Sequence, residues 1–333
     1  MDKRLGRFLF MAAMLAIAVP LAFSQSKAGD KIVIMPGNLG NPYFEVCRDG
    51  ALRAGKELGV EIIYQGSAEP IAEQQIEVIE TLIAQGVAGM AISASDPEAL
   101  VPVAKKAMKA GIKITSYDTP IAPAGRMIDV MPATNEVIGR TLGRIMAAQV
   151  NKKGQVAILS ATSSFFATNE WVRFATDELK KYPDIKMVGV VYGDDLSDKS
   201  YREALGLMKT FPDLKGIISP TSVGVVAAAK AIDDKGMKGK IQLTGLGLPS
   251  EMKEYIKKGV CTQLTLWDPG ELGYAAVYST YRLVKGQNKG AEGEKIDLGK
   301  LGKVPIGKDG QVFMTEKLPI FDASNIDKWA AIF

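Results

Sequence analysis

The stretch Lys31 to Gly66, KIVIMPGNLGNPYFEVCRDGALRAGKELGVEIIYQG, contains the unit from which the rest of the chain is built. Its apolar run 32–35 predicts a strand, and the Pro, Gly and Asn residues of 36–42 favour turns. Apolar residues at helical spacing from Phe44 to Leu58 predict a helix, and 60–64 predicts the next strand. The stretch therefore predicts a strand-helix-strand unit of a parallel sheet, whose first loop lies where such sheets bind ligands.

The same alternation of strand and helix continues along the chain. Two consecutive sets of about five parallel strands with right-handed crossovers predict an α/β fold of two similar doubly wound lobes joined by a hinge. The predicted strands after the first two are 89–93, 112–117, 127–131, 156–160, 186–192, 216–219, 241–245 and 262–267.

The hinge is expected at Met131 to Thr134 and after Trp267, and the Gly- and Lys-rich tail is expected to cross back between the lobes. The predicted division of the chain is a signal peptide at 1–25, a first lobe of 30–131 plus about 269–295, and a second lobe of 132–268 plus about 296–333.

The amino terminus has the pattern of an export signal. Basic residues at Lys3, Arg4 and Arg7 precede an apolar run, 8–23, which ends in small residues. A membrane anchor is the alternative, but the run is short and contains Pro20. No cysteine follows it for lipid attachment, so we expect a protein outside the cytoplasm, in the periplasm or the extracellular space.

Composition excludes several classes of function. The net charge of +4 falls by two with the signal, to +2, which argues against nucleic acid as a partner. The chain has no histidine, which removes the commonest general base and transition-metal ligand. Phosphate-binding loops, nucleophile elbows and a complete dinucleotide fingerprint are missing, and Asp194–Asp198 lacks the pattern of a calcium loop. We therefore expect that the protein is not an enzyme and that it binds neither a metal ion nor a cofactor.

The two cysteines, Cys47 and Cys261, lie some two hundred residues apart. The sequence does not show whether these two cysteines pair, and buried free thiols are favoured over a disulfide.

Polar and aromatic residues gather at the predicted strand ends, where two hinged lobes would face each other across a cleft. Carboxylates, amides and rings alternate there and basic residues are scarce, which suits a neutral polyhydroxylated ligand better than an anion. The candidate ligand residues are Asn38, Asn41, Tyr43, Phe44, Asp96, Asp118, Phe166, Thr168, Asn169, Asp194, Thr221, Ser222, Gly247, Trp267 and Asp268.

Several of these residues also have a purely structural interpretation. Tyr43, Phe44 and Trp267 could be ordinary core aromatics, and Asp96 precedes a helix that it could cap. Asp118 differs, because it ends a strand and is followed by Thr119-Pro120 rather than by a helix. A role facing the ligand is therefore better supported for Asp118 than for the others.

The chain resembles the periplasmic sugar-binding proteins of ABC importers, and the resemblance covers essentially all of it after the signal. It is most similar to the rhamnose-binding proteins and next to the autoinducer-2-binding proteins. The motifs that carry the resemblance are Asn41-Pro42-Tyr43-Phe44, Ser93-Ala94-Ser95-Asp96-Pro97, Asp118, Val191 to Ala204, Gly245 to Met252 and Trp267-Asp268-Pro269.

The resemblance implies a receptor that closes around a small neutral sugar and delivers it to a membrane permease, with a chemoreceptor as a second candidate partner. It also implies that Asn41 binds hydroxyls, that Tyr43 and Phe44 cover the sugar, and that Asp118 grips two hydroxyls. Asn169, Asp194, Thr221 and Trp267 would supply contacts from the other strand ends.

Departures from the pattern bear on the identity of the sugar. Gly37 replaces the lysine of autoinducer-2 binders, and Ala167-Thr168 replaces their Asp-Gln pair. Gly247 and Thr119 replace an aspartate and an arginine of the ribose binders. A pocket with fewer charges suits a 6-deoxy sugar such as rhamnose, whose methyl group Phe165 and Phe166 could cover; autoinducer-2 is the alternative ligand.

Overall fold

The first sheet is covered by helices on both faces. Alternate residues of its strands point to opposite sides, so each face has apolar side chains that a helix layer buries. The computed structural model describes residues 31–333. All pairings in this sheet are parallel. Its strands, in spatial order, are β13 (Gln311–Phe313), β5 (Ile128–Met131), β4 (Lys113–Tyr117), β3 (Gly89–Ile92), β1 (Lys31–Met35) and β2 (Glu61–Tyr64).

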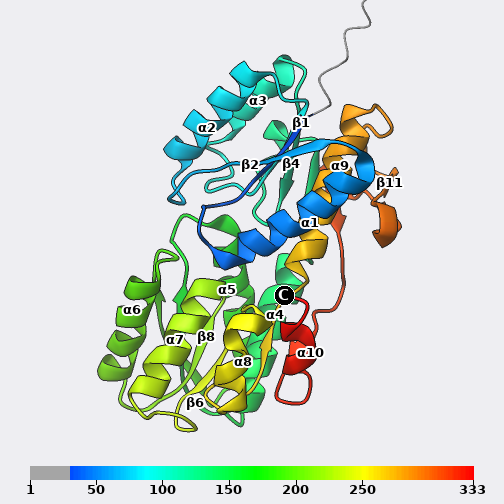
Figure 1. The fold of residues 1–333 in the computed structure, drawn as a ribbon. Coiled ribbons are helices and arrows are strands. Elements are labelled where there is room, and N and C mark those ends of the chain that lie inside the picture. Colours follow the sequence, from blue (N-terminus) through cyan, green and yellow to red (C-terminus); the bar gives the residue numbers. More distant parts are fainter. Residues whose placement is uncertain (1–30) are drawn as a thin grey trace, which may run out of the picture.

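Two pairs of helices sandwich this sheet, and together they form the first lobe (Figure 1). On one face, α2 (Ala72–Gln85) and α3 (Val101–Lys109) pack against each other and bury Val33 and Met35 of β1. On the other face, α1 (Pro42–Leu58) and α9 (Pro269–Val284) pack side by side and bury Ile34. The alternation along β1 thus decides which side chains meet which helix layer.

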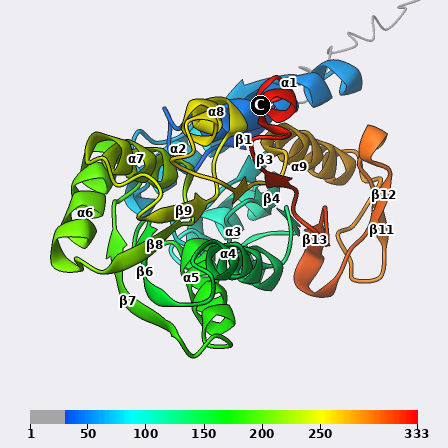
Figure 2. The same ribbon diagram turned by 90° about the horizontal axis from the view of Figure 1, so that it is seen from below.

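The second sheet is built in the same way, with four parallel strands in the order β7-β6-β8-β9. Its helices α4 and α5 pack together, as do α6 and α7, and Figure 2 shows the two pairs on opposite sides of the sheet. The elements of this second lobe are α4 (Asn135–Gln149), β6 (Gly154–Ser160), α5 (Phe166–Leu179), β7 (Ile185–Tyr192), α6 (Ser197–Thr210), β8 (Leu214–Ser219), α7 (Ser222–Asp234), β9 (Gln242–Gly245) and α8 (Pro249–Lys257).

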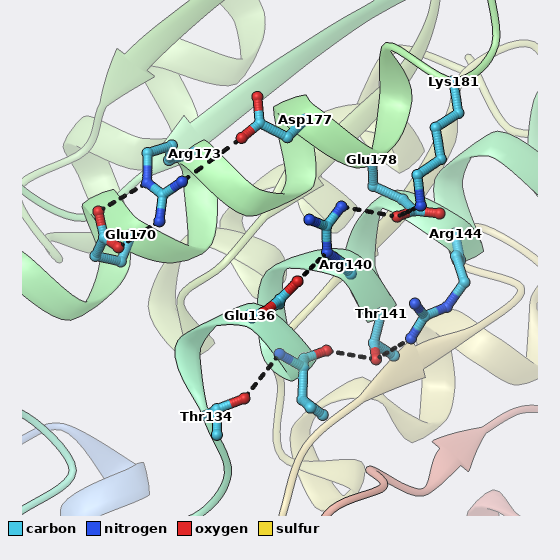
Figure 3. A network of polar contacts seen from close by, with 11 residues as sticks. Thr134, Glu136, Arg140, Thr141, Arg144, Glu170, Arg173, Asp177, Glu178 and Lys181 are labelled. Atoms are coloured by element: carbon cyan, nitrogen blue, oxygen red, sulfur yellow. Dashed lines mark hydrogen bonds and ion pairs between the residues drawn. The ribbon is translucent and has the colours of Figure 1, made fainter. Parts of the chain in front are cut away.

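The interface between α4 and α5 combines close backbone approach with a polar network at its edge. Gly139 and Gly143 of α4 lie so close to α5 that an added Cβ would overlap its atoms. Figure 3 shows the buried carboxylate of Glu178 between Arg140 and Lys181, at 3.3 and 2.7 Å. A buried charge must be paired to be tolerated, and these two cations meet that need.

The tail differs from the sequence prediction, which assigned about 296–333 to the second lobe. A hairpin of β11 (Lys295–Asp297) and β12 (Lys303–Pro305) leads to β13, which pairs with β5 in the first sheet. Only then does the chain cross over, so that β14 (Ile320–Phe321) pairs with β10 (Leu264–Thr265) and α10 (Ile326–Ala330) packs on α8. Short 3₁₀ turns lie at Pro123–Gly125, Gly299–Leu301 and Lys308–Gly310.

The predicted fifth strand of the second set, 262–267, is also different. Only Leu264–Thr265 is strand, and it pairs antiparallel with the tail rather than extending the parallel sheet, apart from a single bridge between Leu246 and Thr265. The α/β fold with two doubly wound lobes is confirmed, and apart from the tail the lobe boundaries in the sequence remain a prediction.

Three segments connect the lobes, at 131–135, 266–269 and 314–319. Two of them run side by side, since Met314 N–H donates to the Met131 carbonyl at 3.0 Å and Thr315 N–H to the Pro132 carbonyl at 2.9 Å. This pairing lies where the sequence predicts the hinge.

Cys47 and Cys261 are buried free thiols, as favoured from the sequence. Burial raises the pKa of the Cys261 thiol to about 12. Over residues 31–333, no helix has both the length and the apolar character needed to cross a membrane. In the same range, no group of three or more Cys, Asp or Glu side chains is placed to hold a metal ion.

The contact between α1 and α9 predicts a strong effect of adding one methyl group. A Cβ at Gly273 would overlap the backbone of Cys47, so Gly273→Ala should lower the free energy of unfolding by about 1–3 kcal/mol. The matched control is Gly206→Ala on the exposed side of α6, where a Cβ meets nothing within 4 Å. The control should gain up to about 1 kcal/mol from helix propensity. Urea unfolding of both variants checks this, and equal stabilities would contradict it.

Candidate functional site

The carboxyl ends of strands from both sheets surround one cavity between the lobes. Its empty volume, with the open solvent at its mouth included, is about 550 Å³. Its lining residues come from both lobes and from the segment before α9: Gly37, Asn41, Tyr43, Phe44, Ser93, Ala94, Asp118, Thr119, Ala161, Phe165, Thr168, Trp171, Asp195, Pro220, Thr221, Ser222, Leu246, Leu266 and Trp267.

Aromatic rings form much of the cavity wall. Tyr43 and Phe44 begin α1, and their ring centroids lie 5.1 Å apart in an edge-to-face arrangement. Trp267 packs edge-on against Tyr43 at 6.0 Å and against Trp171 of α5 at 5.7 Å. Such rings offer flat apolar faces to the C–H side of a ligand.

Asp118 is the carboxylate that the first lobe contributes. It follows β4 with a φ of 62°, a left-handed conformation that aspartate tolerates better than most residues. Oδ1 accepts a hydrogen bond of 2.6 Å from the Tyr43 hydroxyl, and Oδ2 accepts longer ones from Ser93 at 3.3 Å and Thr119 at 3.4 Å. Burial raises the pKa of Asp118 to about 6, although these donors act in the opposite direction.

Asp195 is the carboxylate that the second lobe contributes. It follows β7, also with a left-handed backbone, at φ 53°. Oδ1 accepts from the Thr221 hydroxyl, and Oδ2 accepts from the Asn41 amide at 3.0 Å. Burial raises the pKa of Asp195 as well.

Asn41 joins the two lobes while it caps a helix. Its Oδ1 accepts from Tyr43 N–H at 3.0 Å, which is the N-cap bond of α1, and from the Ser222 hydroxyl at 3.3 Å. Its Nδ2 donates to Asp195 across the cleft. The helix start that holds Tyr43 and Phe44 therefore depends on the residue that touches the second lobe.

No lysine or arginine occurs among the described residues that line the cavity. An anionic ligand would meet two carboxylates there without a compensating cation. A neutral ligand with hydroxyl groups can donate to carboxylate oxygens and place its apolar face on the rings. The arrangement therefore favours binding of a neutral polyhydroxylated molecule.

Eight of the fifteen residues predicted from the sequence line the cavity. Three of them, Tyr43, Phe44 and Trp267, are aromatics for which a role in the core was the alternative. In the structure they are buried and also line the cavity. The eight are Asn41, Tyr43, Phe44, Asp118, Thr168, Thr221, Ser222 and Trp267.

Four predicted polar residues lie outside the cavity lining because their side chains serve local structure. Asp96 accepts from the backbone N–H groups of residues 98 and 99, both at 2.9 Å, as a cap. Asp268 is the N-cap of α9, and Asn169 donates to the Ser163 carbonyl at 2.7 Å. Asp194 pairs with a lysine side chain, Lys199, instead of entering the cavity.

The other three predicted residues are also outside the lining. The amide of Asn38 is buried and reaches only the neighbouring Leu39 carbonyl, at 3.5 Å. Phe166 is 47% exposed, so of the two phenylalanines suggested as a methyl wall only Phe165 lines the cavity. Gly247 is packed against Val225 and Met252.

The residues predicted from the sequence do not include Trp171, which belongs to α5, a helix that starts at Phe166. With the observed start, Trp171 lies one turn after Thr168 on the same buried face, and this three-residue spacing was the available signal. No such signal distinguishes Asp195 from Asp194, since the two are adjacent aspartates and both have a left-handed backbone with φ of 53°.

Comparison with known proteins agrees with this geometry. Residues 32–288 match the family model of a periplasmic binding protein domain. The D-ribose/D-allose-binding protein of Pseudomonas aeruginosa is 26% identical over 272 residues, which span 77% of this chain and 85% of that protein.

Two solved structures are similar over nearly the whole chain. A sugar ABC transporter from Actinomyces odontolyticus is 37% identical with a TM-score of 0.74, and the match covers 90% of this chain and 97% of that one. An ABC transporter solute-binding protein from Clostridium phytofermentas, solved with bound L-rhamnose, is 32% identical with a TM-score of 0.87. That match covers 92% of this chain and 99% of the other.

The raised pKa of Asp118 predicts how the stability of the ligand-free protein changes with pH. The carboxyl titrates near pH 6 when folded and near about 3.9 when unfolded, so between these values the folded state binds more protons. The free energy of unfolding should therefore increase as pH falls from 7 to 4, by up to about 3 kcal/mol from this group.

Chemical denaturation of the wild type and Asp118→Asn across this pH range measures the effect. Subtracting the two curves cancels the contributions of carboxyls that do not interact with Asp118. A difference in stability that stays constant with pH would contradict the assignment.

Proposed function

The chain belongs to the periplasmic binding protein family, and on that premise we propose that it captures a neutral monosaccharide outside the cytoplasm and delivers it to an ABC permease. Members of this family bind solutes and are not enzymes. The observation that carries the proposal is the cavity between the lobes, with two carboxylates, aromatic walls and no basic side chain among its described lining residues.

L-Rhamnose is the sugar that we propose first. A 6-deoxy sugar needs an apolar surface for its methyl group, and Ala161, Phe165, Leu246 and Leu266 provide one in the cavity. The same lining includes Asp118, Asn41 and other polar groups that can meet hydroxyls. The relative from Clostridium phytofermentas, which contains bound L-rhamnose, supports this choice.

Capture would proceed by closure of the lobes about the connecting segments. A ligand that contacts both Asp118 and the second-lobe wall binds the closed state more tightly and so shifts the population toward it. Residues 1–25, where the sequence predicts an export signal, lie outside the described residues, so export through a cleaved signal peptide remains part of the proposal. The same closed form could be presented to a chemoreceptor instead of a permease.

Thermal unfolding with a panel of sugars tests the proposal. L-Rhamnose at a hundredfold its dissociation constant should stabilise the protein by about 2.7 kcal/mol, a shift of several degrees. Fucose, ribose, galactose and autoinducer-2 complete the panel, and Asp118→Ala is the control that should remove the shift. A shift with autoinducer-2 alone would replace rhamnose by the alternative ligand, and no shift with any of them would exclude these ligands.

A further inference from the structure

A chain of two hydrogen bonds leads from Trp267 to the ligand-facing carboxylate of the first lobe. The indole Nε1–H of Trp267 donates to the Tyr43 hydroxyl oxygen at 2.8 Å, and the Tyr43 O–H donates to Asp118 Oδ1 at 2.6 Å. All three side chains are buried. Hydrogen bonds in such a chain polarise one another, so the indole strengthens the bond that Tyr43 makes to the carboxylate.

This relay leaves the two oxygens of Asp118 unequal. Oδ1 is occupied by the short bond from Tyr43, whereas Oδ2 has only the two long bonds from Ser93 and Thr119, at 3.3 and 3.4 Å. A ligand hydroxyl can improve on those long bonds by donating to Oδ2 at normal distance. It gains nothing by displacing Tyr43 from Oδ1.

The relay joins two side chains of the first lobe, Tyr43 and Asp118, to Trp267 in the connecting segment 266–269. Tyr43 is in the first turn of α1, and Trp267 stands two residues before α9, which packs alongside α1 in Figure 1. Gly50 and Gly273 allow this close approach, since a Cβ at either would overlap the partner helix. Of the two tryptophans at the cavity, only Trp171 comes from the second lobe. Trp267, in the connecting segment 266–269, contacts Tyr43 of α1 and Trp171 of α5, at ring-centroid distances of 6.0 and 5.7 Å.

We propose that Tyr43 is a positioning residue that fixes the Asp118 carboxylate through the relay from Trp267, so that Oδ2 is the oxygen offered to a hydroxyl of the sugar. The ligand part of this inference rests on the proposed function, whereas the relay itself is a property of the ligand-free protein. Pre-organised acceptors bind more tightly because they lose less freedom on binding.

Cys47, Asp195 and Tyr117 are titratable groups that interact with the relay. Cys47 lies one turn after Tyr43 on α1, and burial holds the pKa of its thiol well above the usual value, so it stays neutral at working pH. Asp195 faces the cavity from the second lobe, and its negative charge raises the pKa of Asp118, whereas the Tyr43 hydrogen bond lowers it. Removal of the Tyr43 hydroxyl must therefore raise the pKa of Asp118 further.

Tyr43→Phe tests the relay without any ligand, and Tyr117→Phe is its matched control. The hydroxyl of Tyr117 is also buried and lies next to Asp118 in the sequence, but it has no hydrogen-bond partner in the described structure. The titration of the Asp118 carboxyl carbon, assigned with Asp118→Asn, is followed by NMR in ¹³C-aspartate-labelled protein. Tyr43→Phe should raise this pKa by about one unit, and Trp267→Phe by less. Tyr117→Phe should leave it unchanged.

Calorimetric titration with L-rhamnose as the probe tests the ligand part. Tyr43→Phe should weaken binding about tenfold at pH 8 and more at pH 6, because a larger share of Asp118 is then protonated. An unchanged Asp118 titration in Tyr43→Phe would overturn the relay. A shifted titration with unchanged rhamnose affinity at both pH values would overturn the positioning role. If the wild type does not bind rhamnose, the proposed sugar is wrong, while the NMR titration still decides the relay.

Discussion

A carboxylate buried without a cation is the constraint on which the binding cavity depends. Asp118 lies in a cavity with no basic side chain among its described lining residues, so its charge must be met by hydrogen-bond donors. Those donors come from three places in the first lobe: Tyr43 at the start of α1, Ser93 after β3, and Thr119 beside Asp118 itself. The need to satisfy one charge thus holds three strand-end segments in a common arrangement.

Hydrogen bonds from one amide also link the two lobes. Asn41 caps α1, accepts from Ser222 and donates to Asp195, so a single amide serves both a helix start and a contact across the cleft. Each lobe thereby brings one carboxylate whose partners are neutral. A cavity of this kind can discriminate against anions by charge and among neutral ligands by the fit of hydroxyls and apolar groups.

Much of the fold could be predicted from the sequence because its signals are local. The apolar run of β1, the cap at Asn41 and the glycine that ends α1 lie within one short stretch, and repetition of that pattern indicates two parallel-sheet lobes. The tail could not be predicted in this way. Its strand β13 pairs with β5, which is far away in the sequence, and such a pairing leaves little trace in three residues of strand.

For the site, the sequence by itself determined that a carboxylate ends β4, that an amide and two aromatics open α1, and that basic residues are scarce at the strand ends. Only the tertiary structure decided that Asp195 rather than Asp194 enters the cavity, and that Trp171 completes its wall. The physical reason is that spacing along the chain specifies which face of an element a residue occupies, whereas the backbone angles of a turn and the packing of distant helices specify what that face meets.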